Sequence, residues 1–178
     1  MHVFVTGTDG YIGSVLVPIL ARAGHTVTGM DTGYYKDGWL YSRPSFATES
    51  ARTVSMDLRA FDPSVLEGVD AVVHLAELSN DPLGENNPEI TREINHQGSL
   101  RLAEAAKSAG IGRFVYTSSC SVYGVSDLDF VDETSATDPQ TEYARCKVLV
   151  ERDVGKLVDS DFAAVFLRNA TAYGASPR

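Results

Sequence analysis

Cysteine, positive charge and long apolar runs are all scarce in this 178-residue sequence. The two cysteines, Cys120 and Cys146, do not form a Cys-x-x-Cys pair, and no His/Cys cluster has the spacing of a zinc site. We therefore expect reduced thiols and no bound metal. No apolar run approaches the roughly 20 residues that cross a bilayer. The first residues lack a basic region and a cleavage site, which predicts an uncleaved cytoplasmic protein with no membrane partner.

Acidic residues outnumber basic ones, 24 against 15, which gives a net charge of -9. Such a chain has no basic stripe for a phosphate backbone, so nucleic acid is not expected as a partner. Any anionic ligand must be held by local donors, for example the N–H groups at the start of a helix. A hydrophobic content of 43% predicts one well-buried globular domain.

Strand-like and helix-like segments alternate along the chain. The expected strands cover residues 2–6, 26–31, 53–56, 70–75, 113–118 and 162–168. The expected helices cover residues 11–23, with Pro18 as a candidate kink, 88–109 and 142–158, and a long aromatic loop covers 32–50. This alternation predicts an α/β fold with right-handed βαβ units and a doubly wound parallel sheet.

Three glycines, Gly7, Gly10 and Gly13, join the first strand to the first helix with the spacing G-x-x-G-x-x-G. Glycine permits a tight turn, a close approach of the backbone to a pyrophosphate, and close packing of helix on strand. The N–H groups at the helix start then face the anion. The alternative is that the turn needs glycine for its geometry alone. The position between a strand and a helix favours a dinucleotide site, whose other candidate contacts in this segment are Asp9, Tyr11 and Ile12.

Asp31 ends the second expected strand, 18 residues after Gly13. A carboxylate at this place can accept hydrogen bonds from the ribose hydroxyls of adenosine and repels a 2′-phosphate. No arginine follows immediately, so the cofactor we expect is NAD and not NADP. The alternative is that Asp31 only caps the turn that follows it.

Further motifs follow in order along the chain: Met56-Asp57-Leu58, His74-Leu75-Ala76-Glu77, Asn95, residues 117–124, Tyr143-x-x-x-Lys147, and Leu167-Arg168 before Tyr173-Gly174. With the glycine turn, they make the chain resemble the extended short-chain dehydrogenase/reductases, especially the NAD-dependent nucleotide-sugar epimerases and dehydratases. The resemblance implies a Rossmann fold of strand order 3-2-1-4-5-6 over residues 1–178. It also implies a smaller C-terminal substrate lobe that this chain does not contain. Relatives often dimerise through the helices matching 88–109 and 142–158, although both helices could simply cover the sheet.

The resemblance assigns more cofactor contacts after the third and fourth strands and on the long helix, at Asp57, Leu58, Leu75, Ala76, Glu77 and Asn95. Asp57 and Leu58 would meet the adenine, and Asn95 would support the active site. Relatives often have Ala or Gly where Glu77 stands, so a carboxylate here changes the pocket. His74 is expected to pack in the sheet.

Tyr143 and Lys147 are four residues apart, which puts them on one face of a helix. A phenol with a pKa near 10 is a poor base at neutral pH, but a nearby ammonium and an oxidised nicotinamide lower that pKa. Tyr143 could then remove a proton from a sugar hydroxyl. The resemblance adds Ser119 as the third catalytic residue, the alternative being that it stabilises a turn at the strand end.

The type of reaction depends on Cys120 and Ser121, which stand where similar 4,6-dehydratases have an Asp-Glu pair. The chain lacks that acid and base, so we expect a 4-epimerase-type reaction on a UDP- or dTDP-sugar. Cys120, Ser121 and Thr171 are candidate substrate contacts, and Thr171 replaces the Asn that is usual in the family. The alternatives are a dehydrogenase or ketoreductase, a non-classical dehydratase, and a dinucleotide-binding module without catalysis.

Overall fold

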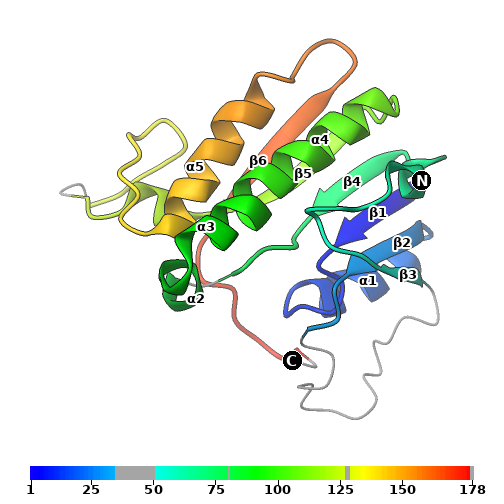
Figure 1. Ribbon diagram of the computed structural model, residues 1–178, viewed down its shortest axis with the longest axis horizontal. Helices are drawn as coiled ribbons and strands as arrows, with labels where there is room; N and C mark the ends of the chain where they lie inside the picture. The colour runs from blue at the N-terminus through cyan, green and yellow to red at the C-terminus, as the bar shows by residue number, and fades with distance from the viewer. Residues whose placement is uncertain (35–50, 80, 127–128, 177–178) are drawn as a thin grey trace.

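A computed structural model describes residues 1–34, 51–79, 81–126 and 129–176 of the chain. Most of the loop expected over 32–50 therefore lies outside the described residues. Within them, a central parallel sheet has α1 on one face and α4 and α5 on the other (Figure 1). This is the doubly wound α/β arrangement that the alternation of elements predicts.

The six strands are β1 (His2–Thr6), β2 (Thr26–Asp31), β3 (Ala51–Ser55), β4 (Ala71–His74), β5 (Arg113–Ser119) and β6 (Ala163–Asn169). They form one sheet in the order β3-β2-β1-β4-β5-β6, and each neighbouring pair is parallel. The predicted strand order is confirmed. The prediction for β3 was wrong at its start, because the strand begins at Ala51, which pairs with Val27 of β2, and not at residue 53.

The helices are α1 (Gly13–Arg22), α2 (Asp81–Asn86), α3 (Pro88–Thr91), α4 (Ser99–Ser108) and α5 (Glu142–Gly155), with 3₁₀ turns η2 (Pro63–Leu66) and η4 (Cys120–Tyr123). The single regular helix predicted over 88–109 is wrong in its interior. Between α3 and α4 the chain forms a π-helical segment, η3 (Arg92–Gly98). The kink expected at Pro18 does not interrupt α1. Helix α2 and both 3₁₀ turns were not predicted, because they are too short to show a clear hydrophobic period.

The core consists of two layers, one on each face of the sheet. Successive side chains of a strand point to opposite faces, so Val3 and Val5 pack with Val17 of α1, whereas Phe4 joins the larger cluster beneath the other helices. That cluster includes Leu102 of α4, and every one of these five side chains is at most 3% exposed. Burial on both faces explains why the central strands are almost continuously apolar.

The segment after β6 returns to the glycine turn and α1. The Tyr11 hydroxyl donates to the Gly174 carbonyl over 2.6 Å, and the Ser176 hydroxyl donates to the Tyr11 carbonyl over 2.9 Å. In Figure 1 the described segment after β6 accordingly runs to the same side of the molecule as α1. Among the residues that the structure describes, none belongs to a helix long and apolar enough to cross a bilayer.

His74 lies at the end of β4 and is fully buried. Its Nδ1 is 2.6 Å from the Thr6 hydroxyl, and its Nε2 is 2.7 Å from the Ser99 hydroxyl. Burial, together with the nearby Lys147 ammonium, lowers the pKa of His74 from its ordinary value of 6.5 to about 3. A neutral imidazole therefore links β1, β4 and α4 inside the protein.

We expect this imidazole to make the fold sensitive to acid. Below pH 6.5 the unfolded chain takes up a proton on His74 that the native protein refuses until about pH 3, so stability falls throughout that window. The loss attributable to His74 should approach about 1.4 kcal/mol for each pH unit. Urea unfolding at several pH values measures how the free energy of unfolding depends on pH. His74→Gln should be less stable at neutral pH but show a flatter pH dependence, and an unchanged slope would contradict the prediction.

Candidate active site

A cavity of about 660 Å³ lies at the carboxyl ends of the strands. This is where ligands bind in open α/β sheets, beside the point at which the strand order reverses between β1 and β4. The predicted site residues that line it are Gly7, Gly10, Tyr11, Ile12, Gly13, Asp31, Asp57, Leu58, Leu75, Ala76, Glu77, Ser119, Cys120, Ser121, Tyr143, Lys147 and Thr171. The structure thus brings together residues from all six strand ends.

The glycine turn fills the space between β1, α1 and the loop after β4. Gly7 has φ +73°, and a Cβ on it would lie 2.8 Å from the Ala76 nitrogen. A Cβ on Gly13 would lie only 2.1 Å from the Gly7 carbonyl oxygen. Both positions therefore require glycine for the turn itself. The turn also lines the cavity, so this structural need for glycine is compatible with the predicted ligand-binding role.

Asp31 holds a fixed position at the end of β2. One of its carboxylate oxygens accepts a hydrogen bond from the Asp9 N–H over 2.9 Å, and the other accepts from the Gly33 N–H over 2.8 Å. The residue caps the turn that follows it and at the same time faces the cavity. Asp9 itself does not line the cavity, and its backbone contributes by orienting Asp31.

Asp57 and Leu58 follow β3 with different roles in the structure. The Asp57 carboxylate pairs with Arg59 over 2.7 Å, and the hydrogen bond from Arg59 lowers the pKa of this carboxyl group. Leu58 is 4% exposed and belongs to the larger core cluster. A Cβ on Gly98 of η3 would lie 3.0 Å from the Leu58 Cβ, so the close approach of the π segment supports this wall of the cavity.

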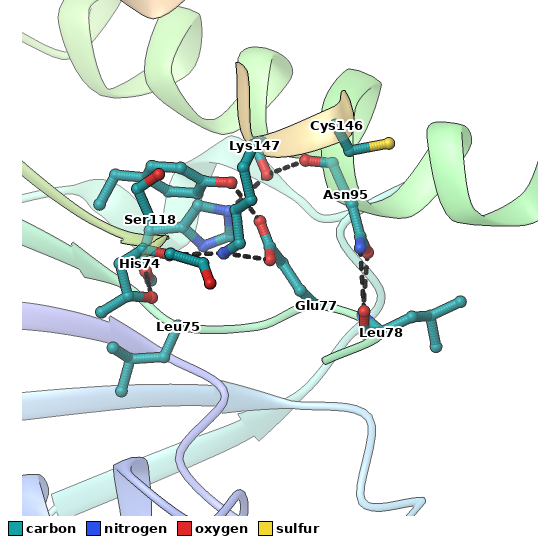
Figure 2. Close-up of polar contacts among 12 residues, drawn as sticks. His74, Leu75, Glu77, Leu78, Asn95, Ser118, Cys146 and Lys147 are labelled. Atoms are coloured by element: carbon teal, nitrogen blue, oxygen red, sulfur yellow. Dashed lines mark hydrogen bonds and ion pairs between the residues drawn. The ribbon is translucent and has the colours of Figure 1, made fainter. Parts of the chain in front are cut away.

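Asn95 is fully buried and does not line the cavity. Its side-chain oxygen accepts from the Leu78 N–H over 2.8 Å, and its amide nitrogen donates to the Leu78 carbonyl over 3.0 Å. Figure 2 shows this two-point contact between the helix and the loop after β4. Asn95 lies within η3, and π turns of this kind often occur at functional sites. The residue therefore acts on the cavity through the Leu78 loop.

Tyr143 and Lys147 occupy successive turns of α5, which begins at the Thr141 cap. The Lys147 Nζ lies 5.1 Å from the centre of the Tyr143 ring and 4.6 Å from that of the Tyr116 ring. It also donates to the Thr117 carbonyl over 2.5 Å. Lys147 is 3% exposed, so its ammonium group acts on the neighbouring phenol in a poorly solvated place.

Glu77 forms a buried ion pair with Lys147, and both side chains are 3% exposed (Figure 2). The Tyr116 hydroxyl donates to the other carboxylate oxygen over 2.5 Å. Burial raises the pKa of Glu77, opposed by the Lys147 charge and by these hydrogen bonds. Sequence reasoning missed this ion pair, because no local spacing connects residue 77 with residue 147.

Ser119 and Ser121 lie together at the end of β5. The Ser119 oxygen accepts from the Ser121 N–H over 3.1 Å and from the Ser121 hydroxyl over 2.9 Å, which leaves its own hydrogen to be donated. Ser118 instead donates to Glu151 over 2.5 Å, and Glu151 pairs with Arg168 of β6 over 2.7 Å. The direction of its hydroxyl makes Ser118 a structural residue and favours Ser119 for chemistry.

Other cavity residues were not predicted as contacts: Met30, Thr32, Tyr34, Met56, Leu78, Ser79, Pro82, Ile94, Thr117, Ser118, Asn169, Ala170 and Ala172. Most of them end a strand or follow one directly. The rule that ligands bind beyond the carboxyl ends of parallel strands could have found these. Ile94 and Pro82 carry no such signal. Within the described ranges, no group of three or more His, Cys, Asp or Glu side chains could hold a metal ion.

Comparison with known families gives a match to the NAD dependent epimerase/dehydratase family over residues 3–178. A UDP-glucose 4-epimerase of Mycolicibacterium smegmatis is 35% identical over 162 residues, which make up 85% of this chain and 49% of that protein. A UDP-glucose 4-epimerase of Corynebacterium glutamicum is 28% identical over 97% of this chain and 50% of its own length. The chain thus spans about half the length of the curated relatives it matches.

Solved structures show the same similarity. An NAD-dependent NDP-hexosamine 5,6-dehydratase involved in tunicamycin biosynthesis superposes with a TM-score of 0.86 and 25% identity, over 99% of this chain and 57% of that one. The UDP-glucose 4-epimerase of Thermus thermophilus, solved as a complex with NAD, gives a TM-score of 0.79 and 27% identity, over 94% of this chain and 54% of that one.

Proposed function

Because this chain belongs to the NAD-dependent epimerase/dehydratase family, we propose that it binds NAD and oxidises and reduces a carbinol of a nucleotide-activated sugar in a 4-epimerase-type reaction. One observation carries the proposal. The glycine turn and Asp31 line the same cavity as Ser119, Tyr143 and Lys147. A dinucleotide site and an acid–base site therefore face one space.

The residues present fit a dinucleotide. Gly7, Gly10 and Gly13 line the cavity without a Cβ, so the backbone beside the start of α1 can come close to a pyrophosphate. Asp31 is held ready to accept hydrogen bonds from ribose hydroxyls. Lys147 would hold the nicotinamide ribose, Asp57 would meet the adenine, and Leu75 would line the pocket. NAD, when bound, supplies the acceptor and donor of hydride.

In the proposed mechanism Tyr143 accepts the proton of the sugar hydroxyl, since the Lys147 ammonium favours its phenolate form. The Ser119 hydroxyl donates to the reacting oxygen and holds it in place. Inversion of the carbon would require hydride to return to the opposite face of the oxidised sugar, while Tyr143 returns its proton to the same oxygen. Cys120, Ser121 and Thr171 line the part of the cavity that we assign to the sugar.

Incubation of the protein with UDP-glucose and with its 4-epimer tests the proposal, and a panel of UDP- and dTDP-sugars extends it. Interconversion without net formation of NADH is the expected result. The similarity to a 5,6-dehydratase favours a dehydratase as the second candidate, and that reaction would give a product lighter by one water. Accumulating NADH would indicate a dehydrogenase. If dinucleotide binds and no sugar reacts, the chain is a binding module.

Partners of the protein follow from the same proposal. The nucleotide sugar is the small-molecule partner, and a second copy of the chain would pack through the helical layer of η3, α4 and α5. The outward positions of that layer include Arg101, Glu104 and Arg145, all exposed. Their opposite charges suit a polar, self-complementary surface.

Replacement of Asp31 is expected to change the choice between NAD and NADP. Asp31→Ser removes the carboxylate that repels a 2′-phosphate, so the ratio of the NADP to the NAD dissociation constant should fall by about tenfold or more. Calorimetric titration with NAD and with NADP measures both dissociation constants and hence their ratio. Asp70→Ser is the matched control, because Asp70 precedes β4 at the opposite end of the sheet. An unchanged ratio for Asp31→Ser would remove Asp31 from the site.

A further inference from the structure

We propose that Glu77 is a positioning residue that balances the charge of Lys147 and thereby sets the preference of the site for oxidised over reduced dinucleotide. The inference rests on the proposed function, since it concerns the same cavity. It adds a role for a carboxylate that the mechanism above does not use.

The geometry makes Glu77 and Lys147 one unit. Their side chains come from the loop after β4 and from α5, meet as an ion pair, and are each 3% exposed (Figure 2). Both residues line the cavity together with Tyr143. The Tyr116 hydroxyl holds the second oxygen of Glu77, and the Thr117 carbonyl holds the Lys147 ammonium. Neither charge can turn away without losing a buried partner.

Apart from the phenol of Tyr143, whose ring centre lies 5.1 Å from the Lys147 Nζ, the titratable groups packed around this pair are neutral near pH 7. On β4, burial lowers the pKa of His74 to about 3. On β5, burial and the Glu77 charge raise the pKa of Tyr116 well above its ordinary value. On α5, burial raises the pKa of Cys146 to about 12. These three groups add no charge to the ion pair, which itself has one positive group, Lys147, and one negative group, Glu77.

This balance matters because the two forms of the cofactor differ by one positive charge on the nicotinamide ring. Beside Lys147 alone, that charge would meet an uncompensated ammonium in a poorly solvated pocket and would be repelled. With Glu77 ionised, the Glu77–Lys147 pair has no net charge, so it does not repel the positive nicotinamide ring of NAD⁺. Removal of the Glu77 charge should therefore weaken binding of NAD⁺ relative to NADH by about tenfold.

The ratio of the two dissociation constants separates this role from simple packing. NAD⁺ and NADH share the adenosine, both phosphates and both riboses. A distorted pocket would weaken the two forms alike, whereas a change of charge weakens one of them selectively. The ratio is also measured without turnover, so it does not depend on the sugar substrate.

The experiment titrates wild type, Glu77→Gln, Glu77→Ala and Glu77→Asp with NAD⁺ and NADH at constant pH and ionic strength. The Gln and Ala variants should raise the ratio of the NAD⁺ to the NADH constant about tenfold. The Asp variant should restore most of the wild-type ratio. The Ala variant keeps the test decisive if the Gln variant misfolds, because both substitutions remove the carboxylate charge.

Glu151→Gln is the matched control. Glu151 is also a largely buried carboxylate paired with a cation, Arg168, but it does not line the cavity. The ratio of the NAD⁺ to the NADH dissociation constant in Glu151→Gln should equal that of wild type. If Glu77→Gln and Glu77→Ala weaken both dinucleotides equally, the charge-balance role is wrong and the proposed function stands. If the wild-type protein binds neither dinucleotide, the proposed function itself fails.

Discussion

Tyr143→Phe is expected to reduce turnover of the nucleotide sugar by about 10³-fold, within the range of 10² to 10⁴ that a general acid–base group contributes. The substitution removes one oxygen and keeps the ring, whose centre lies 5.1 Å from the Lys147 Nζ. Binding of NAD and thermal stability should therefore stay close to those of wild type. The phenylalanine cannot accept the proton of the sugar hydroxyl at any pH, so the loss should persist across the pH profile.

Turnover of Tyr143→Phe is measured with UDP-glucose and its 4-epimer, and binding is measured with NAD alone. Tyr123→Phe provides the matched control. Tyr123 is also a mostly buried tyrosine, but its hydroxyl meets Arg168 over 3.1 Å and it does not line the cavity. Its turnover should change little. Retention of full activity by Tyr143→Phe would refute the proposed mechanism, because no other phenol that lines the described cavity precedes a lysine by one helical turn.

Gly13→Ala is expected to abolish measurable dinucleotide binding and to destabilise the fold. A Cβ at this position would lie 2.1 Å from the Gly7 carbonyl oxygen and 2.8 Å from the Thr8 Cα. Both atoms belong to the backbone of the turn, so relief of the clash must move α1 away from β1. Overpacking of this kind costs about 1–3 kcal/mol in unfolding free energy. The displaced N–H groups at the helix start would then no longer converge on a pyrophosphate.

Calorimetric titration with NAD and urea unfolding measure the two effects of Gly13→Ala. Gly155→Ala, at the end of α5, is the control, because a Cβ there would meet nothing within 4 Å. It should leave dinucleotide binding unchanged. Gly10→Ala should be intermediate, since its Cβ would lie 3.2 Å from the Gly7 oxygen. Wild-type affinity in Gly13→Ala would show that the turn does not hold the dinucleotide.

The elements of the fold were largely predictable because their signals are local. Continuous apolar runs such as that of β4 predict buried parallel strands, and the apolar period of 3.6 residues predicts the helices. The π-helical segment at residues 92–98 lies inside the single helix that the sequence predicts over 88–109, so the local pattern did not separate it from an α-helix. Within this segment Asn95 contacts Leu78, which lies 17 positions earlier in the chain and is beyond the reach of local spacing.

The residues of the candidate site likewise fall into those that local sequence spacing reveals and those that only tertiary contacts bring together. The glycine spacing, the carboxylate at the end of β2, and a tyrosine one helical turn before a lysine can all be found in the sequence, because each depends on neighbours within a few residues. By itself, then, the sequence determined most of the elements, the glycine turn that we propose as a dinucleotide site, and the helical spacing of Tyr143 and Lys147. The tertiary structure alone decided that Glu77 would meet Lys147 and that Asn95 would hold Leu78. The physical reason is that such contacts join separate crossovers of the sheet, whose relative position depends on the packing of the whole core and not on local spacing.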